Sequence, residues 1–278
     1  MYLLLVNPKA GNKLYRRVER RFVGSLNRYK IKYKLVLIDD LANTGELLKE
    51  NIKDSTKAVV AVGGDGTVTS VIDALADYDL PLAIIPTNRT NHLAKLLGIA
   101  DWRAGVRVLA HHQIHAKRLG KIGQRYFMGA LTIAPKRNLI KQLFGQKSRL
   151  KRFFGTNLAQ HLKHQHSVAC QLKLDDMLSV SGQFIRLDIQ LMDEGKKKMR
   201  IQLHTLIESG TEASVLWANK LEIGSSLNMP IISGNETLAN TPATIQAVTK
   251  TIEALHPIPR PRRKRVLSAA KSVGHEQG

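Results

Sequence analysis

The segment Gly63-Gly64-Asp65-Gly66-Thr67 combines three glycines with an acid and a hydroxyl, a set of residues suited to phosphate chemistry. It follows the apolar run at 58–62 and precedes apolar residues at helical spacing, which predicts a loop between a buried strand and a helix. Glycines let the backbone approach a phosphate without a Cβ in the way, and a helix amino terminus attracts anions. Thr67 can cap this helix, and Asp65 can hold Mg²⁺ or polarise an attacking hydroxyl. The alternative interpretation is a tight strand-to-helix turn with Asp65 as its cap.

The elements that must position this loop follow from apolar runs that alternate with segments of helical spacing. We expect strands at 2–6, 33–38, 58–62 and 82–86, and helices at about 13–28, at 44–52, after the glycine loop and from near Thr90. This alternation predicts an α/β domain with a doubly wound, mostly parallel sheet. Ligands bind beyond the carboxyl ends of the strands in such sheets, where Asn7, Gly63 and Thr87 fall.

From about His115 the pattern changes to short alternating runs separated by turn residues. Such runs predict a second domain of antiparallel strands, a β-sandwich or open barrel. We therefore divide the chain into an α/β domain at 1–114, a β-rich domain at 115–256 and a basic disordered tail at 257–278.

The charge balance points to anionic partners. Lys and Arg outnumber Asp and Glu by 43 to 22, giving a net charge of +21. The basic, amphipathic stretch at 146–164 predicts a helix that either contacts anionic lipid or packs on the sandwich. Aromatic residues make up 5% of the chain and no stacking motif appears, so we expect no sequence-specific binding of nucleic acid.

Two further features concern location. The single Cys170 cannot form an intramolecular disulfide, which favours a reducing compartment and hence the cytoplasm. No run approaches the roughly 18 to 20 apolar residues that span a bilayer, so any membrane contact is expected to be peripheral.

Several motifs together resemble the diacylglycerol kinase catalytic domain family, which includes bacterial lipid kinases and sphingosine kinases. They are the glycine loop, Asn7-Pro8-Lys9-Ala10-Gly11, the segment 86–94 with Asn91, Arg118-Leu119-Gly120-Lys121, and Gly234-Asn235-Glu236. The resemblance implies an ATP-binding α/β domain, a lipid-binding β-sandwich domain, and ATP and Mg²⁺ as cofactors. It places the nucleotide at Asn7, Gly63, Gly64, Asp65, Gly66, Thr67 and Asn91, with Asp65 or Glu236 assisting deprotonation of a lipid hydroxyl.

The chain departs from the family pattern mainly at acidic positions. Ser70, His92, Arg118 and Gly234 stand where the family has acids, Gly234 replacing its usual catalytic base, and Asn88-Arg89 replaces Gly-Thr. Phosphoryl transfer needs oxygen ligands for Mg²⁺, so these changes impair transfer more than binding. Arg89 and Arg118 either contact phosphate in place of the metal or are solvated surface residues.

Three functions remain open on this reasoning. The leading one is an ATP-dependent lipid kinase relative that phosphorylates a diacylglycerol-like hydroxyl. The second is a weakly active or inactive nucleotide- or lipid-binding member of the same family, and the third is a basic nucleic-acid-binding protein.

The remaining histidine and aspartate clusters give little support for a metal site. The sequence assigns neither the metal ligands nor the oligomeric state. His111, His112 and His115 lack accompanying Cys or carboxylate ligands and suit the end of a surface helix. Asp175 and Asp176 suit a turn at a strand end, with a Mg²⁺ role as the lesser alternative.

Overall fold

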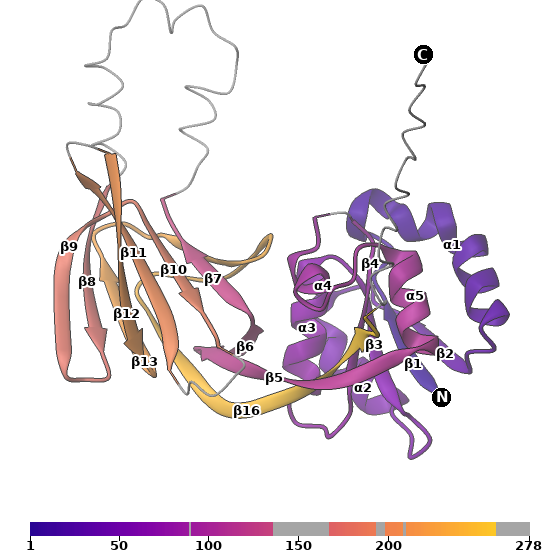
Figure 1. Cartoon of the computed structure of the whole chain (residues 1–278). Helices are drawn as coiled ribbons and strands as arrows, with labels where there is room; N and C mark the ends of the chain where they lie inside the picture. Colours follow the sequence, from indigo (N-terminus) through magenta and orange to yellow (C-terminus); the bar gives the residue numbers. More distant parts are fainter. Residues whose placement is uncertain (89, 136–166, 193–197, 208–209, 260–278) are drawn as a thin grey trace, which may run out of the picture.

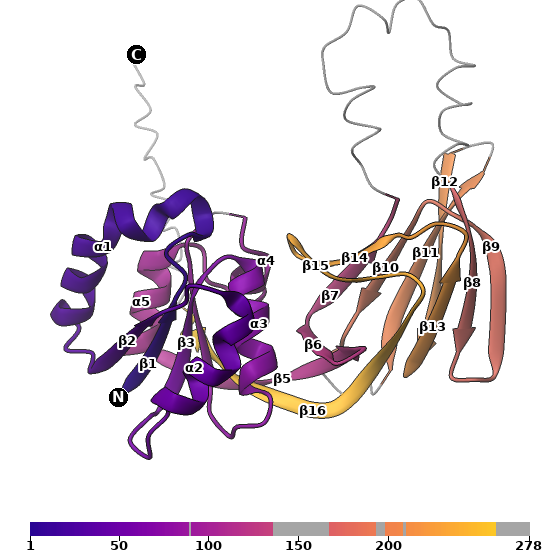
Figure 2. The same cartoon turned by 180° about the vertical axis from the view of Figure 1, so that it is seen from behind.

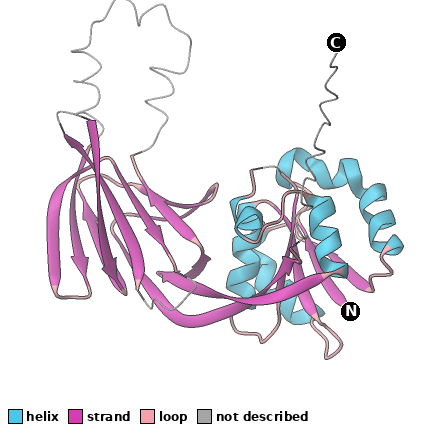
Figure 3. Ribbon diagram, viewed as in Figure 1, coloured by secondary structure: helices cyan, strands magenta, loops and turns pink. Residues whose placement is uncertain are grey.

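The computed structural model describes the whole chain except residues 89, 136–166, 193–197, 208–209 and 260–278. The described residues form a helix-covered part and an all-strand part (Figures 1 and 3). The basic helix predicted at 146–164 and most of the predicted tail lie outside the described residues. Pro257, which the sequence analysis assigned to the tail, instead ends the last strand.

Four parallel strands form the centre of the amino-terminal part, in the order β2-β1-β3-β4. They are β1 (Tyr2–Val6), β2 (Tyr33–Leu37), β3 (Ala58–Gly63) and β4 (Leu82–Pro86). Every residue of β3 and β4 is buried, which explains their continuous apolar sequences. The predicted strands are therefore confirmed to within one residue at their ends.

Helices cover both faces of this sheet (Figures 1 and 2). Helices α1 (Ala10–Arg28) and α5 (Trp102–Ala110) lie on one face, and α2 (Thr44–Asn51) and α3 (Asp65–Leu75) on the other. A short turn, η1 (Leu41–Asn43), leads into α2, and α4 (His92–Leu96) begins two residues after the predicted start at Thr90. None of the described helices has the length and apolar character needed to cross a membrane.

The carboxy-terminal part is a β-sandwich, as predicted. One of its layers has the order β12-β11-β10-β7-β14-β15, and the other contains β16, β13, β8 and β9 together with β5 and β6. The strands are β5 (His112–Ile122), β6 (Arg125–Met128), β7 (Ala130–Ile133), β8 (Val168–Leu174), β9 (Leu178–Phe184), β10 (Arg186–Gln190), β11 (Met199–Ile207), β12 (Gly210–Ala218), β13 (Lys220–Ser225), β14 (Pro230–Ser233), β15 (Glu236–Asn240) and β16 (Ala243–Pro257). Apolar residues between the layers form a core separate from that of the first sheet.

Two long antiparallel strands, β5 and β16, join the two parts (Figure 1). Ile252, Ala254 and Leu255 of β16 lie in the core of the first part, and Ala254 pairs with Leu82 of β4 in parallel. The chain therefore crosses between the parts twice. The boundary after residue 114 stays a prediction, and it did not include this return of β16.

Helix α3, which follows the glycine loop, is tied to the second part by its own acidic residues. Asp73 accepts hydrogen bonds from the Tyr126 N–H and from Arg125 Nε at 3.1 Å, both on β6. Burial raises the pKa of the Asp73 carboxyl, and these hydrogen bonds oppose the shift. Asp77, just after the helix, pairs with Lys250 of β16 at 2.7 Å. These contacts fix the glycine loop relative to the sandwich.

Candidate active site

The glycine loop lies between β3 and α3, as the sequence predicts. Its backbone is packed so closely that side chains would not fit, since a Cβ on Gly63 would lie 2.4 Å from Thr67 Oγ1. A Cβ on Gly66 would lie 2.6 Å from an oxygen of Glu236, which comes from the other part of the chain. Gly64, and not Thr67, occupies the capping position of α3, so the predicted capping role of Thr67 is wrong.

Two asparagines predicted to bind the nucleotide are hydrogen-bonded to this loop. Asn7, directly after β1, donates from Nδ2 to Thr67 Oγ1 at 3.0 Å. Asn91 caps α4 by accepting from the Ala94 N–H at 2.7 Å, and donates to the Gly63 carbonyl at 3.2 Å. Both amides therefore hold the loop in place, and their contact with a nucleotide stays a prediction.

Two buried polar atoms beside the loop have no hydrogen-bond partner within the described part of the chain. They are Thr87 Oγ1 and Asn88 Oδ1, which follow β4 at the same edge of the sheet. The Thr87 hydroxyl faces Gly11, where a Cβ would lie 2.9 Å from it, and Asn88 Nδ2 lies 3.7 Å from the Cβ position of Gly64. A buried polar atom without a partner is costly, so these atoms mark a place for a polar ligand. Sequence reasoning gave neither atom a role.

Asp65 is the most heavily bonded group of the site. Its carboxylate is 3% exposed and accepts from the backbone N–H groups of His92 and Leu93 at 2.8 and 3.2 Å. The other oxygen accepts from Asn235 Nδ2 at 2.8 Å, and this amide also donates to the Thr90 carbonyl at 3.0 Å. Asp65 thus connects the amino end of α4 to the turn between β14 and β15.

The residues Gly234, Asn235 and Glu236 bring the second part of the chain to the loop. Gly234 has a φ of +61°, and a Cβ there would lie 2.8 Å from the Asp65 carboxylate, so both backbone and space require glycine. Glu236, at the start of β15, places a carboxylate oxygen beside Gly66. Its carboxylate makes no hydrogen bond or ion pair to any residue that the structure describes. Asp65 and Glu236 therefore share one site, although 170 residues separate them in the sequence.

The substituted family positions have different environments. The backbone of His92 bonds Asp65 while its side chain is exposed, and Gly234 lies against the same carboxylate. Arg118 is half-buried and donates from Nε to the Val248 carbonyl of β16 at 3.2 Å, so it is not a freely solvated surface residue, and its contact with phosphate stays a prediction. Arg89 lies outside the described residues.

The other candidate metal ligands do not join the site. His111 ends α5, and His112 Nδ1 contacts the Val108 carbonyl at 2.9 Å, in agreement with the predicted helix end. No group of three His, Cys, Asp or Glu side chains placed to hold a metal ion occurs in the described ranges.

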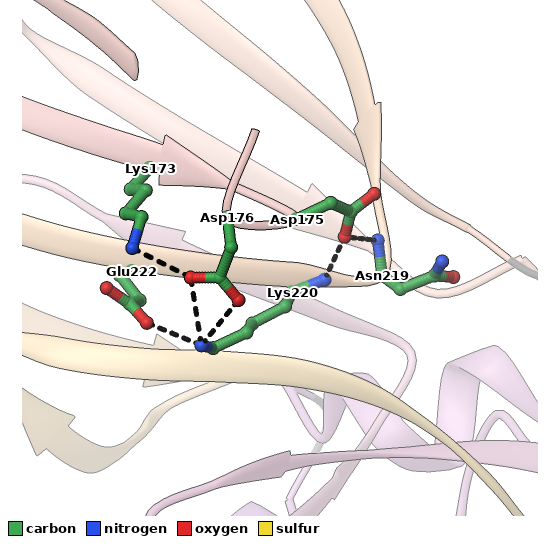
Figure 4. Close-up of polar contacts among 6 residues, drawn as sticks. All are labelled: Lys173, Asp175, Asp176, Asn219, Lys220 and Glu222. Carbon is green, nitrogen blue, oxygen red and sulfur yellow. Dashed lines mark hydrogen bonds and ion pairs between the residues drawn. The ribbon is translucent and has the colours of Figure 1, made fainter. Parts of the chain in front are cut away.

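Asp175 and Asp176 form a turn in the sandwich (Figure 4). Asp175 accepts from the backbone N–H groups of Asn219 and Lys220, and Asp176 pairs with Lys173 and Lys220 at 2.8 and 3.0 Å. Hydrogen bonds from these two lysines hold the pKa of Asp176 below its ordinary value. The turn interpretation is confirmed, and the lysine side chains occupy the place that a cation would need.

A cavity of about 880 Å³ lies between α4 and the sandwich, next to the loop and hairpin. His92, Leu93 and Gly234 belong both to its wall and to the surroundings of Asp65. The cavity is therefore continuous with the predicted nucleotide site.

Comparison with known proteins agrees with this arrangement. Residues 1–122 match the sequence model of the diacylglycerol kinase catalytic domain. The amino-terminal part of the chain belongs to the diacylglycerol kinase catalytic domain family. This diacylglycerol kinase-like assignment agrees with the resemblance found from the motifs, and it covers the glycine loop and both asparagines.

Curated relatives and a solved structure extend the likeness into the second part. The chain is 20% identical over 191 residues to a diacylglycerol kinase of Staphylococcus carnosus, a match that covers 68% of this chain and 61% of the relative. It is 22% identical over 192 residues to a diacylglycerol kinase of Bacillus subtilis, covering 68% and 62%. The matches thus span less than two thirds of either relative. A crystal structure of a diacylglycerol kinase from Bacillus anthracis superposes with a TM-score of 0.65 at 14% identity, covering 92% of this chain and 96% of the other, which supports the two-part fold.

Proposed function

We propose that this chain transfers the terminal phosphoryl group of ATP to a hydroxyl group of a diacylglycerol-like lipid. One observation carries the proposal: the carboxylate of Glu236, which has no partner among the described residues, lies beside Gly66 of the glycine loop. A loop that suits phosphate and a carboxylate able to accept a proton thus meet at one place, next to a cavity that can admit an acceptor. The family of residues 1–122 supports a kinase activity of this type.

The residues beside β3 and β4 fit a nucleotide. Gly64, with only Asn88 Nδ2 among the described residues near its Cβ position, at 3.7 Å, leaves the backbone open at the amino end of α3, an 11-residue helix whose dipole favours anions. The partnerless oxygens of Thr87 and Asn88 offer polar contacts at the same edge. We assign ATP to this edge, with the Asn7 and Asn91 amides holding the loop that receives it.

Mg²⁺ accompanies ATP in this proposal. Among the described residues, few carboxylates near the loop are available as protein ligands for this ion. Mg²⁺ in such sites is bound by one or two carboxylates, with phosphate oxygens and water completing its coordination. Asp65 already accepts three hydrogen bonds, so Glu236 is the carboxylate beside the loop with more acceptor capacity left among the described residues. We assign Glu236 to accepting the proton of the acceptor hydroxyl.

In the proposed step, the acceptor hydroxyl oxygen forms a bond to the γ-phosphorus of ATP and the bond to the β–γ bridging oxygen breaks. ADP leaves, and the hydroxyl proton passes to Glu236. This role replaces that of the family base, whose position Gly234 occupies, and Asp65 positions the turn that carries Glu236. Such a base contributes about 10² to 10⁴ in rate.

The direct test is incubation of the purified protein with γ-labelled ATP, Mg²⁺ and a total lipid extract. We expect label in a lipid fraction, and calorimetry is expected to detect ATP binding. Neither nucleotide binding nor labelled lipid would contradict the proposal.

A second function is favoured by the loss of two family acids, whose positions His92 and Gly234 occupy. It is a member of the same family that binds nucleotide and lipid without transfer, and ATP binding without labelled product would support it. Peripheral contact with an anionic membrane, a cytoplasmic location and the absence of sequence-specific nucleic-acid binding stay predictions.

A further inference from the structure

The cavity beside the candidate site is lined by cationic side chains from three different elements. Lys95 comes from α4, Lys117 from β5 and Arg186 from β10, and no acidic residue is among the described residues that line it. The exposed His92 also lines this cavity. Cations around a recess attract an anionic ligand, because the low-dielectric walls focus their field.

The high net charge of the chain does not account for this lining. Two other cavities, of about 660 and 610 Å³, open on the sandwich. The first is lined by no charged residue, and the second has Glu222 as its charged residue. The concentration of cations is therefore a property of the cavity that borders Gly234.

The three cations differ in how far the protein already neutralises them. Arg186 Nε pairs with Asp188 at 2.7 Å, which offsets part of its charge. The exposed Lys95 ammonium, in contrast, makes no hydrogen bond or ion pair within the described part of the chain. Lys95 is thus the cation best placed to gain from an anionic ligand.

The same wall also carries apolar side chains. Leu96 is 43% exposed, which is high for a leucine between two packed parts, and the other apolar residues that line the cavity are Leu93, Met128, Leu191, Met192 and Ile232. Gly129, with a φ of +82°, lets the strand connection approach Leu96, because a Cβ there would lie 2.8 Å from Leu96 Cδ2. A ligand with an apolar portion and an anionic group fits this mixture.

We infer that the acceptor is an anionic amphiphile, an alcohol that carries a phosphate-type group held by Lys95 and Lys117 in addition to the hydroxyl that is phosphorylated. This inference rests on the proposed function for the identity of the reacting hydroxyl. It adds that an uncharged diacylglycerol is the poorer ligand, since it would leave the Lys95 charge without a partner. The hydroxyl lies toward Gly234 and Glu236, and the apolar portion contacts Leu96.

The test is calorimetric binding to the full chain of two short-chain lipids that differ in charge. The probes are dihexanoylphosphatidylglycerol, which is anionic and has free hydroxyls, and uncharged 1,2-dihexanoylglycerol. We expect wild-type protein to bind the anionic lipid at least about tenfold more tightly, because a hydrogen bond between charged groups contributes this much. Lys95→Glu should remove that preference.

Lys49→Glu is the matched control, because it makes the same charge change at an exposed residue of α2 that does not line the cavity. It should keep the preference of the wild type. Equal affinity for the two lipids, or equal losses in the two variants, would overturn the inference. Glycerol 3-phosphate bound as tightly as the anionic lipid would overturn the assignment to a lipid.

Binding and turnover separate this inference from the proposed function. Selective binding of the anionic lipid without phosphorylated product supports the inference and contradicts the kinase proposal. Phosphorylation of both lipids at equal efficiency supports the kinase proposal and contradicts the inference.

Discussion

The glycine loop at 63–67 and the hairpin of β14 and β15 face each other across the candidate site, and they use their polar groups differently. On the loop side, Asn7, Asn91 and Asp65 are all hydrogen-bonded to neighbouring protein groups. On the hairpin side, Asn235 is bonded to Asp65, whereas the Glu236 carboxylate has no partner in the described part. The polar side chains of the loop are thus held by the protein, whereas the hairpin carries the carboxylate to which we assign the proton in the proposed step.

This comparison assigns different roles to the two carboxylates that the sequence left as alternatives. Asp65 is a positioning residue whose acceptor capacity serves the fold. Glu236 is the candidate base. Each assignment predicts a different balance of effects on rate and on stability, so paired variants can separate them.

The largest expected effect is on turnover. Glu236→Gln should lower the phosphorylation rate by about 10² to 10⁴, the usual contribution of a general base. Its stability should stay close to that of the wild type, because the carboxylate makes no hydrogen bond or ion pair to a described residue that the amide would lose. The measurements are initial rates with labelled ATP and thermal unfolding, with Glu50→Gln on the exposed surface of α2 as the control. A variant as active as wild type would remove Glu236 from the mechanism.

Asp65→Asn should lower both the phosphorylation rate and the stability of the fold. The amide nitrogen cannot accept a hydrogen bond, so one or more of the bonds from His92, Leu93 and Asn235 is lost. Hydrogen bonds to a charged group contribute about 1.5 to 3 kcal/mol, and we expect the free energy of unfolding to fall by about that amount. Activity should be abolished, because the turn that carries Glu236 is no longer held.

Denaturant unfolding of this variant, beside Asp54→Asn at an exposed position, checks the stability change. Equal stability of the two variants would contradict the positioning role of Asp65. If Asp65→Asn keeps full stability but loses turnover, Asp65 and not Glu236 becomes the candidate base.

The smallest expected effect is on the reactivity of the Cys170 thiol, which lies in the sandwich core that supports the hairpin. Burial raises the pKa of the Cys170 thiol to about 11, so the folded protein should not react with a thiol reagent at pH 8. The raised pKa means that this thiol contributes stability below its ordinary pKa of 9.0 and loses it as the pH rises toward about 11. Labelling in native and denaturing buffer checks this, and fast native labelling would contradict a closed core around β8.

Local patterns were sufficient to predict the strands and helices of the first part. The runs at 2–6, 58–62 and 82–86 are buried on both faces, and such strands need continuous apolar sequence. The glycine loop follows from residues that are adjacent in the chain. In the sandwich, the return of β16 to the first sheet escaped prediction, because strand pairing over long separations leaves little local signal.

The sequence by itself determined the fold class, the glycine loop and the family of the amino-terminal part, since each depends on residues close together in the chain. The tertiary structure decided that the Asp65 carboxylate is hydrogen-bonded and that Glu236 has no partner among the described residues. The difference depends on donors from His92, Leu93 and Asn235, which are distant from Asp65 in the sequence. The tertiary structure also brought Lys95, Lys117 and Arg186 to one cavity. Their convergence results from the packing of α4 on the sandwich, and no spacing in the sequence encodes it.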